Sequence, residues 1–197
     1  MYREHNPIIA AGMREDFRTF QRGVMFAVCS IRQPTVTVPD QIAALFDSGA
    51  YDEFPLFGFK FASWDFVQSD LCKALWAATR ADYDPERLIL AISRIPGLGI
   101  VKSAFVAQLM GSNVGCIDSR NAKRLGLGPE PYKTRGERDK RSRAFRARVA
   151  RYVRAWGGRS EELWDSWCLE VAAVYNLSPD EVSALHLAIL PPDFVPF

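Results

Sequence analysis

Apolar residues recur at intervals of three and four positions along most of this chain, which is the spacing of one face of an α-helix. The clearest case starts at Asp84 with a capping carboxylate, a proline at the first helical position and an acid in the first turn. Leu88 and Ile92 then continue the apolar face. The same criteria predict helices over residues 13–29, 40–47, 63–80, 84–95, 100–110, 119–125, 140–156, 160–175 and 180–189. The expected fold class is therefore all-α.

The breaks between these helices are short. Pro7 interrupts the pattern near the N-terminus, and Thr35–Val38 has a brief strand-like alternation flanked by prolines. Gly126–Pro131 is expected to be a connection, and Pro191–Phe197 an extended strap on the surface. We expect a single domain over residues 1–197, built of two interleaved helical lobes.

The turn over residues 95–100 reads Ile-Pro-Gly-Leu-Gly-Ile and separates two of the predicted helices. Pro96 and Gly97 end the first helix, and Gly99 lets the backbone turn tightly before the second. Such a turn presents unpaired backbone N–H groups at a helix N-terminus, which favours binding of a phosphate. We interpret residues 84–110 as a helix-hairpin-helix element whose Gly97, Gly99 and Ser103 contact a DNA backbone. An ordinary helical hairpin with a glycine-rich turn fits the same residues.

The composition indicates which classes of protein the chain can belong to. With 197 residues, 48% of them hydrophobic, the chain can bury a substantial core. It has no apolar run of about 18 residues and no signal-peptide pattern, which predicts an intracellular protein, cytoplasmic or nucleoid-associated, that does not enter a membrane. The four cysteines match no zinc or iron-sulfur spacing and there are two histidines, so we expect buried free thiols, no metal and no cofactor.

The net charge of +2 hides a strongly basic segment. Residues 132–154 contain ten Lys and Arg side chains against two acids, a net charge of +8, so the rest of the chain carries −6. A basic block in an otherwise acidic protein is typical of a nucleic-acid-binding surface, where Arg is favoured for phosphate contacts. We expect some of these arginines, including Arg141, to contact DNA. Because Phe145, Val149 and Tyr152 give the segment an apolar side, the arginines also fit the solvated face of a helix.

Asp118 stands nineteen residues after Gly99, in the run Ile-Asp-Ser-Arg-Asn. A fixed carboxylate in a poorly hydrated cleft can stabilise positive charge on a sugar, or orient and deprotonate a nucleophile. An Asp in this context is also a good N-cap for a following helix. Both roles are therefore open at this position.

Four segments in one order resemble the helix-hairpin-helix DNA glycosylase superfamily, which includes endonuclease III-like and oxoguanine glycosylases. The likeness covers roughly residues 15–175. Its segments are Phe20–Thr35 with a Ser-x-x-Gln-x-Thr turn, Phe57–Trp64, Tyr83–Gly99 and Ile117–Asn121. The resemblance implies a two-lobed all-α fold, without the iron-sulfur cluster of some members, that acts as a monomer on double-stranded DNA. It also implies an enzyme that flips a base out of the duplex and cleaves its N-glycosidic bond.

The resemblance assigns roles to individual residues. Gln33, with Arg32 beside it, would reach into the DNA, and Asp118 would be the catalytic carboxylate. In the family this aspartate also begins a helix, so the catalytic and capping roles are compatible. Three aromatic residues would line the base pocket, although each also suits packing between the lobes: Phe57, Phe59 and Trp64. Further DNA contacts are expected at Arg120 and Asn121.

Lys102 departs from the family pattern. Bifunctional members carry a nucleophilic lysine two residues after the second hairpin glycine, where this chain has Val101. Lys102 follows one residue later, about 100° further round a helix. It would be either a displaced nucleophile that forms a Schiff base with the sugar, or a phosphate contact in a glycosylase that uses water. Arg120 stands where the family often has a histidine.

Three functions fit these residues. The one we expect is a DNA base-excision glycosylase, with or without an AP lyase step. The second is a DNA-hypermodification transferase of the same fold, which acts on a modified pyrimidine without removing it. In that case Arg120 and Lys102 would suit an anionic leaving group such as pyrophosphate. The third is a non-catalytic DNA-binding relative in which Asp118 is only a cap.

Overall fold

The protein is all-helical, as the hydrophobic pattern predicts. The computed structural model describes residues 1–48, 56, 58–127, 132, 134 and 136–195, with 71% helix and no strand among them. The α-helices are α1 (Tyr2–Glu15), α2 (Phe17–Cys29), α3 (Val38–Ala43), α4 (Phe59–Val67), α5 (Asp70–Thr79), α6 (Pro85–Ile92), α7 (Ile100–Leu109), α8 (Ser119–Arg124), α9 (Arg143–Trp156), α10 (Ser160–Tyr175) and α11 (Pro179–Ala184). Short 3₁₀ or π segments are η1 (Thr35–Thr37), η2 (Ala44–Ser48), η4 (Asp139–Arg141) and η5 (Leu185–Ile189).

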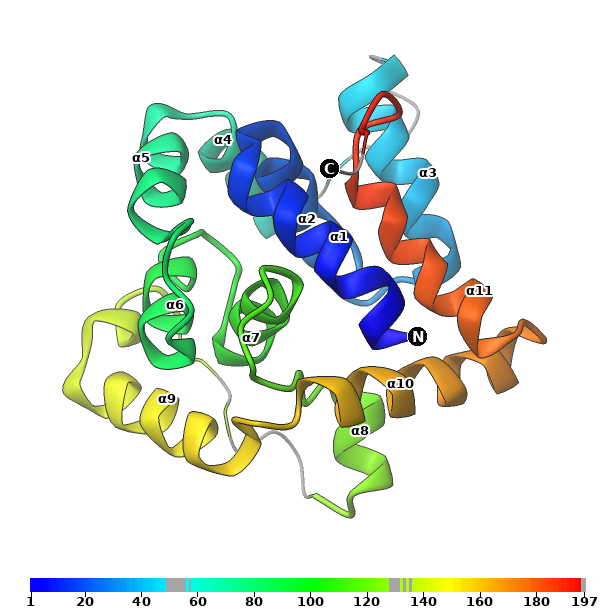
Figure 1. Cartoon of the computed structure of the whole chain (residues 1–197). Helices are drawn as coiled ribbons and strands as arrows, with labels where there is room; N and C mark the ends of the chain where they lie inside the picture. The colour runs from blue at the N-terminus through cyan, green and yellow to red at the C-terminus, as the bar shows by residue number, and fades with distance from the viewer. Residues whose placement is uncertain (49–55, 57, 128–131, 133, 135, 196–197) are drawn as a thin grey trace.

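Helix α2 lies at the centre of the molecule. It contacts α1, α3, α4 and α7, and its residues 19–29 are all buried. In Figure 1, α4, α5, α6 and α9 lie to one side of α1, α2 and α7, while α3, α10 and α11 lie to the other. Side chains from both sides join one continuous buried cluster, to which α2 contributes Phe20 and Phe26. The central helix, buried from residue 19 onwards, therefore fixes the positions of the segments packed against it.

The N-terminal region differs from the prediction. Helix α1 runs through Pro7, and α2 begins only after Asp16, whose carboxylate accepts a hydrogen bond of 2.6 Å from Thr19 N. Pro7 lacks the N–H that would bond the carbonyl of Arg3, so the helix loses one hydrogen bond close to its start. Burial of Ile9 and Met13 on the same helix offsets that loss. The predicted interruption at Pro7 was wrong for this reason.

Three other segments also differ from the sequence prediction. Residues 63–80 form two helices because Ser69 caps α5, and Thr35–Thr37 is a 3₁₀ turn rather than a strand. The C-terminal strap is turned rather than extended, since Phe194 N donates to Pro191 O at 3.0 Å. Leu190 and Phe194 pack on α1 so closely that a Cβ at Gly12 would lie 2.9 Å and 3.2 Å from them.

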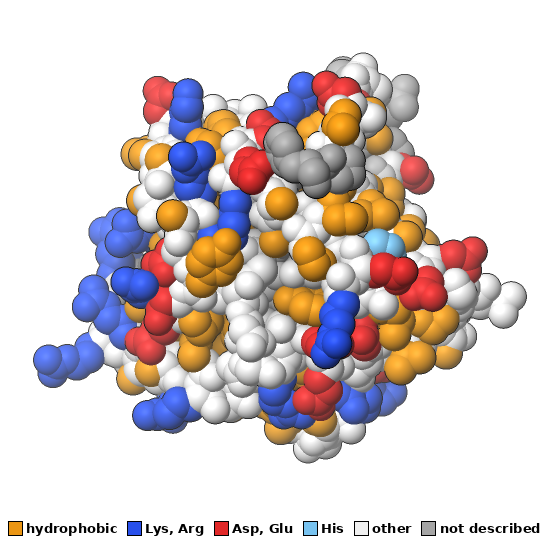
Figure 2. Space-filling model, viewed as in Figure 1, with side chains coloured by type: hydrophobic (Ala, Val, Ile, Leu, Met, Phe, Trp, Pro, Cys, Tyr) orange, Lys and Arg blue, Asp and Glu red, His pale blue; other side chains and the backbone are white. Residues whose placement is uncertain are grey.

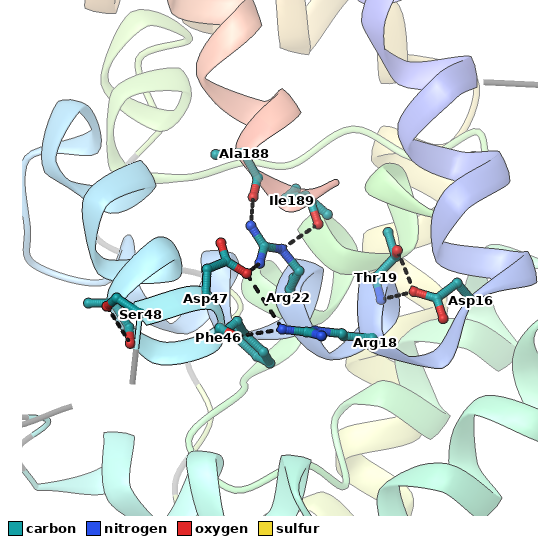
Figure 3. Close-up of polar contacts among 10 residues, drawn as sticks. Asp16, Arg18, Thr19, Arg22, Phe46, Asp47, Ser48, Ala188 and Ile189 are labelled. Atoms are coloured by element: carbon teal, nitrogen blue, oxygen red, sulfur yellow. Dashed lines mark hydrogen bonds and ion pairs between the residues drawn. The ribbon is translucent and has the colours of Figure 1, made fainter. Parts of the chain in front are cut away.

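The C-terminal η5 is fastened to the central helix by a buried arginine. Arg22 of α2 donates to the carbonyls of Ile189 at 3.0 Å and Ala188 at 2.8 Å (Figure 3). Its guanidinium also forms an ion pair with Asp47 of η2, which Figure 3 shows on the same side of α2. Arg22 is 3% exposed, and a buried guanidinium needs such partners to offset its desolvation. These contacts set the position of His186, which lies in η5.

Helices α6 and α7 pack against each other as the helical hairpin predicted over residues 84–110. Asp84 caps α6 by accepting a hydrogen bond of 2.8 Å from Arg87 N. Gly97 has a φ of 78°, a backbone conformation that is strained for residues with a side chain. Helix α7 begins directly after Gly99. The hairpin thus brings the start of α7 against the end of α2, two helices that contact each other.

Candidate functional site

A cavity of about 660 Å³ opens between four parts of the chain that are distant in sequence. Its walls are the end of α2 with residues 30–35, the first turns of α7, residues 116–122 around the start of α8, and the aromatic residues of α10. His186 of η5 also lines it. Six residues singled out in the sequence meet there: Arg32, Gln33, Lys102, Asp118, Arg120 and Asn121.

Asp118 is the N-cap of α8, and both of its carboxylate oxygens are engaged. Oδ1 accepts hydrogen bonds from Arg120 N at 3.1 Å and Asn121 N at 3.0 Å. Oδ2 accepts one of 2.8 Å from Nε1 of Trp167, which reaches over from α10. The carboxylate therefore has a fixed orientation at the cavity wall, and its capping role coexists with a place in the site.

The backbone before Asp118 is held by a tyrosine on the buried face of α9. Tyr152 Oη accepts a hydrogen bond of 3.0 Å from Ile117 N and donates one of 2.8 Å to Gly115 O. Burial holds the pKa of the Tyr152 hydroxyl well above its ordinary value of 10.0, so it keeps its proton and its donor role. From the sequence, Tyr152 was recognised only as part of an apolar helix face.

Lys102 faces the cavity from the first turn of α7. Its ammonium nitrogen Nζ donates to Ser30 Oγ at 2.8 Å and lies 5.3 Å from the centroid of the Phe105 ring. Val101, which stands where the bifunctional members of the family that the sequence resembles carry a lysine, lines the same cavity. A side chain at either position therefore faces the same space, so the one-residue offset does not remove the amine from the site.

The turn after α2 supplies the cavity rim. Arg32 is exposed and has a φ of 57°, an unusual conformation for a residue that is not glycine. Gln33 is half-buried, and its Oε1 is buried without a hydrogen-bond partner among the described residues. Backbone strain of this kind costs on the order of 1 kcal/mol and is frequent at functional sites. The expected DNA-probing pair thus lies at the entrance of the cavity.

A cluster of aromatic rings forms the deeper wall and was not foreseen from the sequence. The His186 ring lies 4.3 Å from Trp164, 5.1 Å from Phe26, 5.4 Å from Trp167 and 5.8 Å from Phe105, measured between ring centroids. Burial lowers the pKa of His186 to about 4, which leaves the ring neutral at neutral pH. These residues come from four separate helical segments without a local motif, so their convergence is a product of tertiary packing.

Two of the three aromatic residues expected to form the base pocket lie elsewhere. Phe57 is outside the described residues, and neither Phe59 nor Trp64 lines the cavity. Phe59 packs against the hairpin, where a Cβ at Gly97 would lie 2.4 Å from its ring, and Trp64 contacts Phe46 edge-on at 5.3 Å. Within the described chain, the α10 and η5 aromatics take the position at the cavity that these residues were expected to hold.

The hairpin lies outside the cavity and is covered by the segment before α9. Gly97 N donates to Glu137 Oε1 at 3.4 Å, and Lys140 Nζ donates to Ile95 O at 3.1 Å. Thr134 packs on Gly99 so closely that a Cβ there would lie 2.7 Å from its hydroxyl oxygen. Ser103 is fully buried and lines no part of the cavity. A carboxylate thus occupies the hairpin donor that we expected to contact a phosphate.

A basic face lies on the outer side of α9 and just before it. Helix α9 buries Phe145, Val149, Tyr152 and Trp156 and exposes arginines on its other side, as the amphipathic pattern predicts. Figure 2 shows Lys and Arg side chains gathered at the lower left, over α9. We define this basic face by its exposed arginines: Arg138, Arg141, Arg143, Arg146, Arg151 and Arg154.

No family model matches this chain, and no curated protein or solved structure matches it. The chemistry of the site therefore has to be argued from its residues. The four cysteines are free and buried as predicted, and burial raises the pKa of Cys116 at the cavity wall to about 12, which makes its thiol a poor nucleophile. Among the described residues no cluster of His, Cys, Asp and Glu could hold a metal, and no helix is long and apolar enough to span a membrane.

Proposed function

We propose that this protein is a helix-hairpin-helix DNA glycosylase that takes a flipped base into the cavity and cleaves its N-glycosidic bond. One observation carries the proposal: Gln33, Lys102 and Asp118, chosen from three separate sequence segments, line a single cavity. The packed α6–α7 hairpin supports the same assignment. The basic face on α9 would hold the DNA backbone, since arginines there are exposed and available for phosphate contacts.

Asp118 would stabilise the positive charge that develops on the sugar as the base leaves. Its orientation is already set by two backbone N–H groups and Trp167, so no reorganisation is needed during the reaction. Water would then add to C1′ of the sugar, or the amine of Lys102 would bond to C1′, lose its protons to solvent and form a Schiff base as the C1′–O4′ bond of the sugar ring opens. Lys102 is placed for this step because its Nζ already lies at the cavity wall, where it donates to Ser30 Oγ.

The decisive experiment incubates purified protein with duplexes that each carry one damaged or modified base, and follows the products by mass spectrometry. Release of a free base supports the glycosylase. Tight binding with unchanged DNA would instead support a non-catalytic DNA-binding protein, and absence of both binding and product across the panel would contradict the proposal.

Borohydride trapping on an active duplex separates the two roles of Lys102. A covalent adduct that disappears in Lys102→Ala identifies this amine as the nucleophile. An adduct that persists in the variant excludes it. Base release without an adduct assigns the reaction to water, with Lys102 as a contact for an anionic group.

A second candidate is a transferase that modifies a flipped pyrimidine without removing it. The observation that favours it is the charge of the cavity, where, among the described lining residues, Arg32, Lys102 and Arg120 meet one carboxylate, that of Asp118. Three cations suit an anionic leaving group such as pyrophosphate. In the same mass-spectrometric assay, a base that changes mass but stays attached to the DNA would support the transferase over the glycosylase.

A further inference from the structure

The floor of the cavity contains a buried hydrogen-bond acceptor that has no partner. Asn121 is 2% exposed, and its Nδ2 donates to Cys116 O at 2.9 Å and to Leu163 O at 3.1 Å. These two bonds fix which end of the amide is the oxygen, because a carbonyl can only accept. Oδ1 is then left buried and without a hydrogen-bond partner in the described structure. Leaving a buried acceptor unpaired is costly, so such an atom at a cavity wall points to a ligand that donates to it.

His186 offers a second acceptor on the same floor. Its Nδ1 lies 3.1 Å from Ser183 O, so this nitrogen carries the ring proton. The lowered pKa of about 4 keeps the ring neutral, so with Nδ1 protonated Nε2 is the acceptor nitrogen of the ring. His186 is 1% exposed and lines the cavity, as Asn121 does. Two acceptors therefore border the same enclosed space.

Nearby nitrogen donors are already used within the protein. Trp167 Nε1 donates to Asp118 Oδ2, Trp164 Nε1 donates to Ser183 Oγ at 3.0 Å, and Gln108 Nε2 donates to Ser160 O at 2.7 Å. Of the cations of the site, Arg32 is exposed, and the half-buried Lys102 already donates to Ser30 Oγ at 2.8 Å. The buried end of the cavity thus favours a ligand that brings N–H groups and a flat apolar face.

We propose that the floor of the cavity recognises a base with an exocyclic amino group, of the cytosine or adenine type, through Asn121 Oδ1 and His186 Nε2. This inference rests on the proposed function, namely that a flipped base enters the cavity. An amino group brings two N–H bonds for two acceptors, whereas thymine or uracil presents one N–H between two carbonyl oxygens. Carbonyl oxygens would face the lone pairs of the floor and leave them unpaired. The rings of Phe105 and Trp167 would cover the faces of the base.

The test uses the intact protein and five duplexes that differ at one position, placed opposite an abasic site so that flipping breaks no base pair. The position holds cytosine, 2-pyrimidinone, adenine, purine or no base; the second and fourth probes lack only the amino group of the first and third. Affinity is measured by fluorescence anisotropy at one fixed salt concentration. We expect the amino base to bind about tenfold tighter than its counterpart in at least one pair.

Two variants assign the effect to the floor. His186→Phe keeps an aromatic ring but removes Nε2, and it should reduce the preference for the amino base to about twofold or less. Tyr83→Phe is the matched control, since it removes a hydroxyl from an exposed ring that is not part of the cavity lining and should leave the preference unchanged. A full preference retained in His186→Phe would overturn the role given to this residue.

Two results overturn the inference in different ways. If cytosine, 2-pyrimidinone, adenine and purine all bind equally, and all bind tighter than the abasic duplex, a base enters the cavity but its amino group is not recognised. The inference then fails while the proposed function stands. If no base binds tighter than the abasic duplex and no base is released from the damaged-base panel, both the inference and the proposed function fail.

Discussion

The segment around Asp118 and the hairpin of α6 and α7 are held in different ways. The Asp118 segment is fixed by the buried Tyr152 on the backbone before it, the half-buried Trp167 on its carboxylate and the buried Asn121 behind it. The hairpin is held by side chains of the segment before α9, and its partner Glu137 is 61% exposed. The Asp118 segment is thus held by hydrogen bonds inside the protein, whereas the hairpin is covered by side chains at the surface.

This difference separates two tasks. A group that stabilises a transition state works best when it is already oriented, and buried hydrogen bonds provide that orientation. A contact with DNA must instead exchange one partner for another, which is easiest when the first partner is exposed to solvent. In this protein the Glu137 carboxylate already bonds Gly97 N, so a phosphate would replace one anion by another. The predictions below test whether the two regions differ in this way.

Asp118→Asn should have the largest effect. Asn is a good N-cap, so α8 should persist, but the neutral amide cannot stabilise positive charge on the sugar. We expect base release to fall by about a hundredfold or more on whichever duplex proves active, measured in single-turnover reactions. DNA affinity should stay within about twofold of wild type. Full turnover in this variant would end the catalytic assignment.

Acid should destabilise the protein through His186. In the unfolded chain this histidine has a pKa near 6.5, and in the folded protein burial lowers the pKa to about 4. Below about pH 6.5 the unfolded state therefore takes up a proton that the folded state refuses, so stability falls as the pH drops and is unaffected above pH 7. The loss approaches about 3 kcal/mol at pH 4.

The measurement is urea unfolding at pH 7, 5.5 and 4, for wild type and for His186→Phe. The variant lacks the titrating group, so its stability should decline less over this range. Equal declines in the two proteins would show that His186 is not the buried, neutral group described above.

Tyr152→Phe tests directly how the Asp118 segment is held. The substitution removes the hydroxyl that joins Ile117 N to Gly115 O and leaves both backbone groups buried without it. We expect the free energy of unfolding to fall by about 1–3 kcal/mol, measured by urea denaturation. Tyr83→Phe is the control, because Tyr83 is 62% exposed and its substitution should change stability by less than about 0.5 kcal/mol.

Glu137→Gln should produce the smallest change. Unlike the other substitutions, it should strengthen a property of the protein, its affinity for DNA. Gly97 N and Lys140 then lose their anionic partner and can contact a phosphate instead, so affinity for duplex DNA should rise by about threefold at low salt. Glu15→Gln removes the same charge at the exposed end of α1 and controls for the general change in charge. A loss of affinity in Glu137→Gln would mean that Glu137 supports the hairpin rather than covering it.

Local signals in the sequence predicted the fold class and much of the helix pattern. Asp84 with Pro85 marked the start of α6, and the glycines marked the turn before α7. The break at Ser69 was missed because apolar spacing continues across it, and capping by a serine side chain leaves little trace in that spacing. At Pro7 a break was predicted where the helix continues, since a helix tolerates proline near its start when its other residues are buried.

The site was predictable only where a motif carried it. Gln33 and Asp118 belong to segments that the resemblance had marked, Lys102 follows shortly after the hairpin segment, and all three line one cavity. Trp164, Trp167 and His186 come from the C-terminal part of the chain, where nothing in the local sequence distinguishes a cavity wall from an ordinary core. Their positions depend on contacts such as those of Arg22 with η5, which only the folded chain brings together.

The backbone conformation of Arg32 affects which residue selection favours at this position. A glycine would adopt its φ of 57° without strain, so selection for stability alone favours glycine there. Arginine instead adds a cation to the cavity rim. Laboratory evolution for thermostability should therefore replace Arg32 early, whereas evolution under selection for activity should keep it. Whether Arg32 is retained in each experiment then shows whether this arginine contributes to function.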